Sequence, residues 1–217
     1  MKRLVVATLL AFALLVVPLK GATHPLQNSV FPLAMQVNGD DGIQYWANIC
    51  TVSSINPAHN LFMTAAHCVL DEAGHVRANL VVGEELNQAV VQRADPTKDI
   101  AILWTNQPAV AVGKLRTKPL QFKDELQIPS FQLGWWVFML TTGRVTNPDA
   151  IIKGDTKAYM WHDVYGCGGS SGSPILDKDG NLVSIEQVGA RALEPCSGVG
   201  GGATLEQMKD FAKYFPK

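Results

Sequence analysis

Charged residues are scarce in this sequence of 217 residues. They make up 17% of the chain, below the roughly 25% of an average globular domain, and 18 Lys and Arg against 19 Asp and Glu leave a formal net charge of −1. A protein that holds nucleic acid or anionic lipid through phosphate contacts needs a strong positive field, which this composition does not supply. We therefore expect no nucleic-acid partner. The hydrophobic content of 47% is enough for a packed core and excludes disorder as the main state.

Long hydrophobic runs are also missing, apart from one at the N-terminus. Two basic residues follow Met1, and residues 4–19 are then uncharged. This run is shorter than the roughly 20 residues that span a bilayer, and a basic start before a short apolar run is typical of a secretory signal peptide. We expect a signal peptide at 1–22 and a mature domain at 23–217, secreted or periplasmic, with no membrane partner after cleavage. A retained N-terminal anchor is the alternative.

Cysteine is rare as well. The chain has four, Cys50, Cys68, Cys167 and Cys196, and thiols in exported proteins tend to form disulfides. A zinc site is the rival interpretation, but no C-x-x-C pair is present. We expect two disulfides. Four cysteines allow three pairings, and their number and spacing do not choose between them.

Short apolar or alternating runs separated by turn signals predict an all-β protein. Two sets of such runs are divided by a stretch rich in Pro, Gly and Lys at 107–123. We expect two six-stranded antiparallel barrels packed together, the first at about 28–110 and the second at about 120–203. The expected strands are 31–37, 45–55, 61–64, 78–82, 89–93 and 100–104 in the first barrel, and 126–128, 135–141, 143–145, 158–161, 174–176 and 182–188 in the second.

One segment has the pattern of a helix. Thr204 and Gln207 fit a capping box, and apolar residues then recur at helical spacing on one face. We expect a C-terminal α-helix at 204–215. A lid packed on a barrel is favoured over a membrane-bound or partner-binding helix.

Three separated residues have the chemistry of a nucleophilic hydrolase. Ser171 lies in a glycine-rich turn, where missing Cβ atoms let a substrate approach the main chain. A serine hydroxyl is a weak nucleophile unless a base removes its proton, and the base needs a third group to orient it. His67 follows an expected strand, and Asp99 begins another. Each signal alone is weak, but together, in the order His, Asp, Ser, they are specific.

With these motifs the sequence resembles the trypsin-like, chymotrypsin-fold serine peptidases, and in particular their short microbial members. The resemblance covers nearly the whole mature chain and implies a catalytic triad of His67, Asp99 and Ser171. It also implies an oxyanion hole formed by the main-chain N–H groups of Gly169 and Ser171, and disulfides Cys50–Cys68 and Cys167–Cys196. The matching segments are Thr64-Ala65-Ala66-His67-Cys68, Asp99-Ile100-Ala101-Ile102-Leu103 and Gly169-x-Ser171-Gly172-Ser173-Pro174.

The sequence departs from the regulated members of that family in the residue before the nucleophile. Those members have an Asp there, which pairs with a new amino terminus after zymogen cleavage, whereas this chain has Ser170. An Ile-Val-Gly-Gly type of terminus is also missing. We expect no activation by an N-terminal ion pair. Ser173, where animal enzymes commonly have Gly, leaves catalysis unthreatened.

Specificity is harder to predict. The resemblance places Tyr165 at the floor of the substrate pocket, where trypsin itself has a carboxylate, and places Glu186, Gln187 and Val188 on the substrate-pairing strand. Glu186 adds negative charge near the cleft or is a solvated edge residue. Residues 198–202 form the far pocket wall or a flexible loop. His162 resembles the histidines that bind acidic side chains in some relatives, although a surface histidine is favoured.

The remaining histidines lie in polar turns or a tail, so we expect no metal and no cofactor. The leading function is a secreted serine endopeptidase that acts on protein or peptide substrates as a monomer. The alternative is a catalytically silent binding or effector protein on the same fold. An intact triad favours the enzyme, since a binding protein does not need all three groups.

Overall fold

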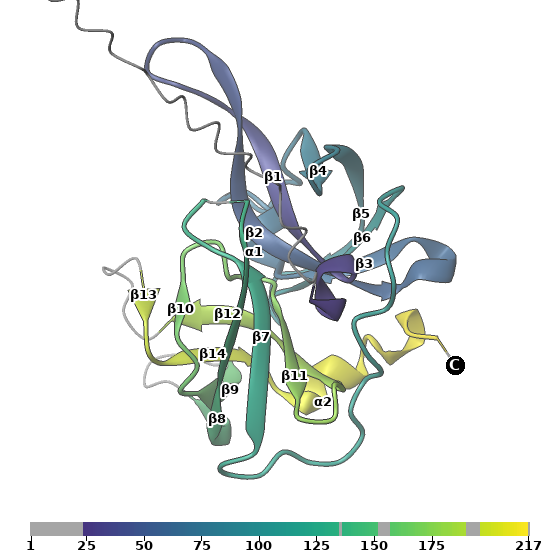
Figure 1. Cartoon of the computed structure of the whole chain (residues 1–217), viewed down its shortest axis with the longest axis vertical. Coiled ribbons are helices and arrows are strands. Elements are labelled where there is room, and N and C mark those ends of the chain that lie inside the picture. The colour runs from purple at the N-terminus through teal and green to yellow at the C-terminus, as the bar shows by residue number, and fades with distance from the viewer. Residues whose placement is uncertain (1–23, 135, 152–156, 190–195, 217) are drawn as a thin grey trace, which may run out of the picture.

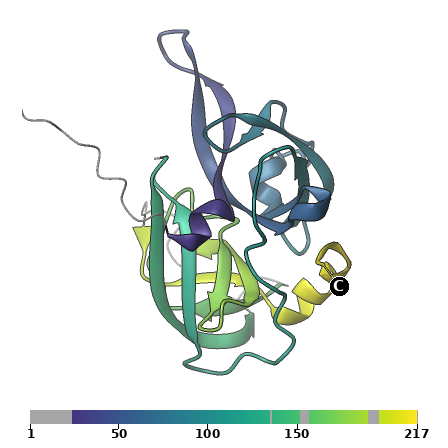
Figure 2. The ribbon, with the colours of Figure 1, turned by 45° about the vertical axis from the view of Figure 1, so that its right-hand side comes forward.

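The computed structural model describes residues 24–134, 136–151, 157–189 and 196–216. The expected signal peptide at 1–22 lies outside these ranges. Two barrels lie side by side, and a short C-terminal segment packs beside them (Figure 1, Figure 2). None of the helices in the described ranges has the length and apolar character needed to cross a bilayer.

The first half of the chain forms a closed antiparallel barrel with the strand order β1-β2-β3-β6-β5-β4. Half-buried and exposed side chains alternate along 87–92, as expected for a strand with one face towards the barrel and one towards solvent. Short helical turns lie at η1 (Pro25–Asn28), η2 (Pro57–His59) and α1 (Ala66–Val69). The strands are β1 (Val30–Asn38), β2 (Gln44–Asn56), β3 (Leu61–Thr64), β4 (Leu80–Val82), β5 (Asn87–Asp95) and β6 (Ile100–Thr105).

The second half forms another closed barrel, in the order β11-β12-β14-β9-β8-β7. A separate two-stranded sheet pairs β10 (Gly166–Cys167) with β13 (Cys196–Ser197). The two six-stranded barrels confirm the predicted fold class. The barrel strands are β7 (Glu125–Phe131), β8 (Phe138–Ile151), β9 (Ala158–His162), β11 (Pro174–Asp177), β12 (Leu182–Gly189) and β14 (Gly200–Ala203).

The structure corrects two strand assignments in the second barrel. Residues 143–145, expected as a separate strand, belong to the long strand β8, and Gly143 stays in register opposite Leu126. The sixth strand is β14, which was not among the expected strands, although Gly200 does line a pocket, one of the two roles expected for 198–202. A side chain at Gly202 would clash with the backbone of Ile185. The close approach of neighbouring strands requires glycine here, and a hydrophobic pattern does not detect such a strand.

The C-terminal helix is shorter than expected. The capping box at Thr204 and Gln207 is present, but the α-helix α2 spans only Leu205–Lys209 and is followed by a 3-10 turn, η3 (Ala212–Tyr214). Phe211, between them, is fully buried in the core cluster that the first barrel dominates. We attribute the early end of the helix to the packing of this aromatic ring, since tertiary packing contributes more to helix stability than the sequence pattern does.

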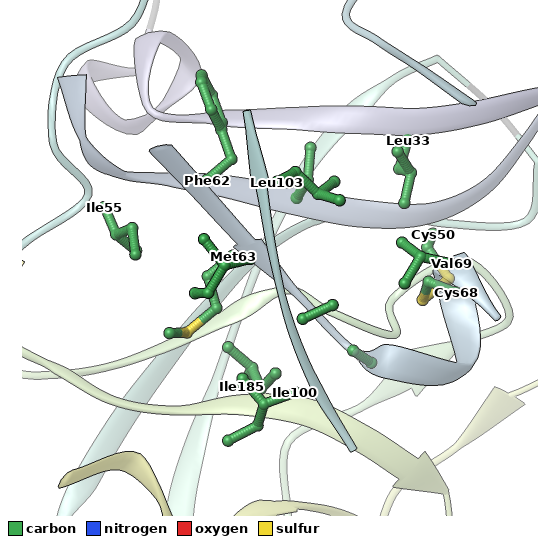
Figure 3. Close-up of a cluster of buried hydrophobic side chains, with 14 of the residues drawn as sticks. Leu33, Cys50, Ile55, Phe62, Met63, Cys68, Val69, Ile100, Leu103 and Ile185 are labelled. Atoms are coloured by element: carbon green, nitrogen blue, oxygen red, sulfur yellow. A yellow bond between two sulfur atoms is a disulfide. The ribbon is translucent and has the colours of Figure 1, made fainter. Parts of the chain in front are cut away.

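Among the residues that the structure describes, the larger of two core clusters fills the first barrel and continues into the second. Phe62, Ile100 and Leu103 of the first barrel and Ile185 of the second are all fully buried within it (Figure 3). Full burial of such a side chain contributes about 1.5–3 kcal/mol. The contact between the barrels is thus part of the core, and it fixes the relative position of loops that come from both.

Candidate active site

His67 is held in place by the elements on both sides of it. It lies in α1, which follows β3 after a single residue, and the next residue, Cys68, is joined by a disulfide to Cys50 on β2. The side chain of His67 is 47% exposed. A half-exposed imidazole with a fixed backbone is accessible to substrate and yet oriented.

Asp99 contacts both the backbone and the ring of His67. Its Oδ1 accepts a hydrogen bond of 2.8 Å from the His67 N–H, and its Oδ2 lies 2.9 Å from the His67 Nδ1. Because a carboxylate at this distance favours a proton on Nδ1, the lone pair of the neutral ring is on Nε2. Asp99 itself has a φ of 54°, in the left-handed region that Asp tolerates better than most residues.

A side chain from the second barrel supports this turn. The Gln187 Nε2 donates hydrogen bonds of 2.8 Å to the carbonyl oxygens of Lys98 and Asp99, while the Gln187 Oε1 accepts one of 2.7 Å from the Lys157 Nζ. The side chain expected to bind substrate is therefore engaged with the backbone beside Asp99.

The Ser171 turn packs directly against the His67 segment. The carbonyl oxygen of Ser171 lies 3.8 Å from the Cys68 Sγ, and a ring nitrogen of His67 lies within 4.8 Å of the sulfur atoms of Cys50 and Cys68. A Cβ at Gly172 would clash with the Thr64 side chain, so only glycine allows this approach. Among the described residues, no hydrogen bond joins His67 to the Ser171 hydroxyl. That bond is often long when no substrate is bound.

Some main-chain N–H groups in this turn have no acceptor among the described residues. The N–H groups of Ser170, Gly172 and Ser173 donate to other backbone carbonyls, whereas those of Gly169 and Ser171 do not. A positive φ of 95° at Gly169 gives this turn a conformation that suits glycine. Two neighbouring, unpaired main-chain donors are the arrangement that an oxyanion hole needs.

The peptide units that carry these two donors are fixed from their carbonyl ends. The carbonyl oxygen of Gly168 accepts a hydrogen bond of 2.6 Å from the Leu133 N–H, and that of Ser170 accepts one of 2.9 Å from the Ser173 N–H. Each peptide plane is rigid, so these bonds also fix the direction of the N–H groups of Gly169 and Ser171.

Thr51 is a residue of the site that the sequence did not single out. It is fully buried on β2, its N–H donates a hydrogen bond of 2.8 Å to the Ser171 carbonyl, and its Oγ1 donates one of 2.9 Å to the Gly169 carbonyl. No local pattern marks this threonine, because its partners come from the other barrel.

Cavities lie on both sides of these groups. A pocket of about 380 Å³ is lined by Ser171, by the disulfide Cys167–Cys196 and by Glu186 and Val188. A wider groove of about 1030 Å³ runs past His67 and Asp99. Ser171 therefore lines the smaller hollow, whereas His67 and Asp99 line the wider one.

The remaining specificity candidates separate into two groups. Glu186, only 5% exposed, and Val188 line the pocket, so Glu186 is not a solvated edge residue. Tyr165 is 55% exposed and does not line the pocket, although its neighbour Gly166 does. His162, expected at the surface, is 1% exposed. Strand β9 places it inside the second barrel, opposite Gly200.

Both disulfides in the structure have the pairing that the resemblance implies. Cys50 is joined to Cys68 beside His67, and Cys167 is joined to Cys196 along the pocket wall. The first bond therefore joins β2 to the segment that carries His67, and the second joins β10 to β13 at the pocket beside Ser171.

Comparisons with known proteins agree with this geometry. The model of the trypsin-like peptidase domain family matches residues 50–185, and the chain belongs to this family. The comparison with curated sequences gives no significant match. Membership of the family supports a peptidase.

Solved structures show the same fold at low sequence identity. The active form of the Rv3671c protease from M. tuberculosis has a TM-score of 0.65 and 21% identity, and the alignment covers 84% of this chain and 78% of that one. Its inactive form also has a TM-score of 0.65, with 18% identity, covering 88% and 90%. The HtrA-type protease AlgW with a decapeptide has a TM-score of 0.70 and 17% identity, covering 87% and 65%.

Proposed function

We propose that the protein is a serine endopeptidase with Ser171 as nucleophile, His67 as general base and acid, and Asp99 as the group that orients the imidazole. Ser171 Oγ attacks the peptide carbonyl carbon while His67 Nε2 takes its proton. The proton then passes to the leaving amine, and water hydrolyses the acyl-enzyme. Asp99 holds the imidazole in the required tautomer and stabilises its protonated form.

The observation that carries this proposal is the pair of unpaired N–H groups beside a histidine that is anchored at two points. The N–H groups of Gly169 and Ser171 are positioned to receive the developing oxyanion, and each such donor contributes roughly 3 kcal/mol in peptidases. The contacts of Asp99 with the backbone and ring of His67 supply the orientation that a general base requires. Peptide substrates fit the family and its AlgW relative, whose structure contains a decapeptide.

Labelling with a fluorophosphonate probe tests the proposal directly. We expect the purified protein to be labelled on Ser171 and to hydrolyse a denatured protein substrate. Labelling should be lost in Ser171→Ala and should fall at least a hundredfold in rate in His67→Ala, since general-base catalysis contributes about 10²–10⁴-fold. His59→Ala, a change at a histidine outside the site, is the matched control. Folded protein that is neither labelled nor active would favour a catalytically silent binding protein.

We also propose that the protein needs no N-terminal ion pair for activity. Ser170, before the nucleophile, is 7% exposed and carries no charge to receive an ammonium group. Protein that begins near residue 23 should therefore be active without further cleavage. Inert protein that gains activity only after an internal cut would contradict this part of the proposal.

The proposed location is outside the cytoplasm, after removal of residues 1–22, with the mature chain acting as a monomer. Two disulfides are compatible with an oxidising compartment. N-terminal sequencing of protein from culture medium or periplasm should find a start near residue 23, and light scattering should give the mass of one chain. A start at Met1 in membrane fractions would indicate a retained anchor.

A further inference from the structure

Glu186 places a negative charge inside the pocket next to the candidate nucleophile. Its side chain is 7% exposed, and it is the only charged residue among the described residues that line this pocket. A buried carboxylate is costly unless it is paired or solvated by hydrogen bonds. The groups around Glu186 therefore decide whether the pocket is charged.

The partner of Glu186 is a histidine in the neutral form. The His162 Nε2 lies 2.6 Å from the Glu186 Oε2, and the His162 Nδ1 accepts a hydrogen bond of 3.2 Å from the Val164 N–H. A nitrogen that accepts a hydrogen bond carries no proton, so the single ring proton is on Nε2 and is donated to Glu186. His162 thus orients the carboxylate without cancelling its charge.

The second carboxylate oxygen is open. Glu186 Oε1 has no hydrogen-bond partner among the described residues, and it is not one of the fully buried polar atoms left without a partner. A Cβ on Gly200 would clash with this oxygen, so the absence of a side chain on β14 keeps the space beside it free. An acceptor with a free lone pair thus remains at the pocket wall.

The rest of the lining suits an aliphatic chain. Val164 and Val188, glycine backbone and the Cys167–Cys196 disulfide form most of the wall, and Ser171 lies at one side. A volume of about 380 Å³ exceeds that of any single side chain. A long side chain with a cationic end matches both features, since its methylene groups bury apolar surface and its charge meets Glu186.

We propose that this pocket binds the side chain of Lys or Arg on the amino side of the cleaved bond, with Glu186 as the residue that selects the positive charge. This inference rests on the proposed peptidase function, and it assigns the selection to Glu186, since Tyr165 lies outside the pocket. An acidic side chain is disfavoured because it would meet a carboxylate of the same sign at hydrogen-bond distance.

A matched peptide series on the wild-type protein tests the inference without any mutation. The peptides differ only at the residue before the cleaved bond, which is Lys, Arg, norleucine, Gln or Glu. Norleucine keeps most of the aliphatic chain of Lys and removes its charge. We expect kcat/KM for Lys or Arg to exceed that for norleucine by roughly 10- to 100-fold, since a hydrogen bond to a charged group contributes about that factor. Equal rates for Lys and norleucine, or a preference for Glu, would overturn the inference.

The variant Glu186→Gln should abolish most of this preference, so that the ratio of kcat/KM for Lys to kcat/KM for norleucine falls towards one. Glu206→Gln is the control, because Glu206 is an exposed glutamate of α2. A Lys preference that survives in Glu186→Gln would also overturn the inference.

A binding measurement separates failure of this inference from failure of the proposed function. In Ser171→Ala, calorimetry with benzamidine, a small cation, should detect binding that Glu186→Gln weakens at least tenfold. Efficient cleavage after apolar residues with no benzamidine binding would refute the Lys or Arg pocket and leave the peptidase intact. Benzamidine binding by a protein that neither reacts with fluorophosphonate nor cleaves peptides would refute the peptidase and leave the cationic pocket standing.

Discussion

The N–H of Thr51 on β2 donates a hydrogen bond of 2.8 Å to the carbonyl oxygen of Ser171, so the first barrel holds the turn that carries the candidate nucleophile. The hydroxyl of Thr51 extends this contact. Its Oγ1 donates to the Gly169 carbonyl at 2.9 Å and accepts from the Phe131 N–H at 2.9 Å. One fully buried side chain therefore links β2, the end of β7 and the turn with the two free N–H groups.

Replacing Thr51 with Val removes the hydroxyl and keeps the shape. Because the Gly169 carbonyl and the Phe131 N–H then lose a buried partner, we expect the free energy of unfolding to fall by about 1–3 kcal/mol. We also expect kcat to fall more than tenfold with little change in KM, since the oxyanion donors act mainly in the transition state. Denaturant unfolding and steady-state kinetics on one peptide measure the two effects.

Thr105→Val is the control for the Thr51 prediction. Thr105 is equally buried in the same barrel, and its hydroxyl accepts only a long hydrogen bond from the Gln107 N–H. It should lose stability with unchanged kcat. A normal kcat in Thr51→Val would mean that the turn holds its shape without the hydroxyl.

Gln187 provides a second test of contact between the barrels. Gln187→Met keeps the length of the side chain but removes both hydrogen bonds to the carbonyl oxygens of Lys98 and Asp99. Since each such bond contributes about 0.5–1.5 kcal/mol, we expect kcat to fall roughly tenfold and the pH profile of kcat to change, because His67 loses part of its orientation. Gln127→Met on β7 is the control. An unchanged pH profile would assign Gln187 a purely structural role.

Much of the fold was predictable because its signals are local. Alternating apolar residues mark the strands of both barrels, and turn residues separate them. The motifs around His67, Asp99 and Ser171 are also short, so a single sequence is enough to find them. The glycines of β14 carry no such signal, and the strand was therefore missed.

The parts of the site that depend on packing between distant segments were not predictable. Thr51 lies 80 residues from Phe131 and 118 from Gly169 in the sequence, yet it forms hydrogen bonds with both. The same reason explains why His162 was expected at the surface. The long-range pairing places β14, with Gly200 opposite His162, between β9 and β12, and the His162 ring meets Glu186 of β12 across it.

The two disulfides should have different effects on activity. Cys50–Cys68 closes a loop of 18 residues and lies next to His67, whereas Cys167–Cys196 lines the pocket. Replacing either pair with Ala should lower the free energy of unfolding by about 3 kcal/mol. We expect the first double variant mainly to have a lower kcat and the second mainly to have a higher KM. Both should be measured well below the melting temperatures of the two variants. Identical changes in kcat and KM would contradict this division of roles.

The ion pair between Lys98 and Asp210 makes the attachment of the C-terminal segment dependent on pH. The Lys98 Nζ lies 2.5 Å from the Asp210 Oδ2. This hydrogen bond holds the pKa of Asp210 below its ordinary value of 3.8 and raises the pKa of Lys98 above 10.5. The stabilisation by Asp210 is therefore complete above pH 3.8 and is lost as the pH falls through the lowered pKa. That of Lys98 is complete below pH 10.5 and is lost as the pH rises through the raised pKa.

Asp210→Asn should consequently destabilise the protein slightly at neutral pH and not at all in strong acid. The loss should shrink in high salt, because Asp210 is exposed and Lys98 is only half-buried, and salt screens such pairs. Chemical unfolding at several pH values and salt concentrations measures this dependence. Glu206→Gln is the control, because its partner Lys209 lies in the same helix and does not connect α2 to the first barrel. A loss in Asp210→Asn that persists in strong acid would show that Asp210 acts through packing, since protonation would already have removed its charge.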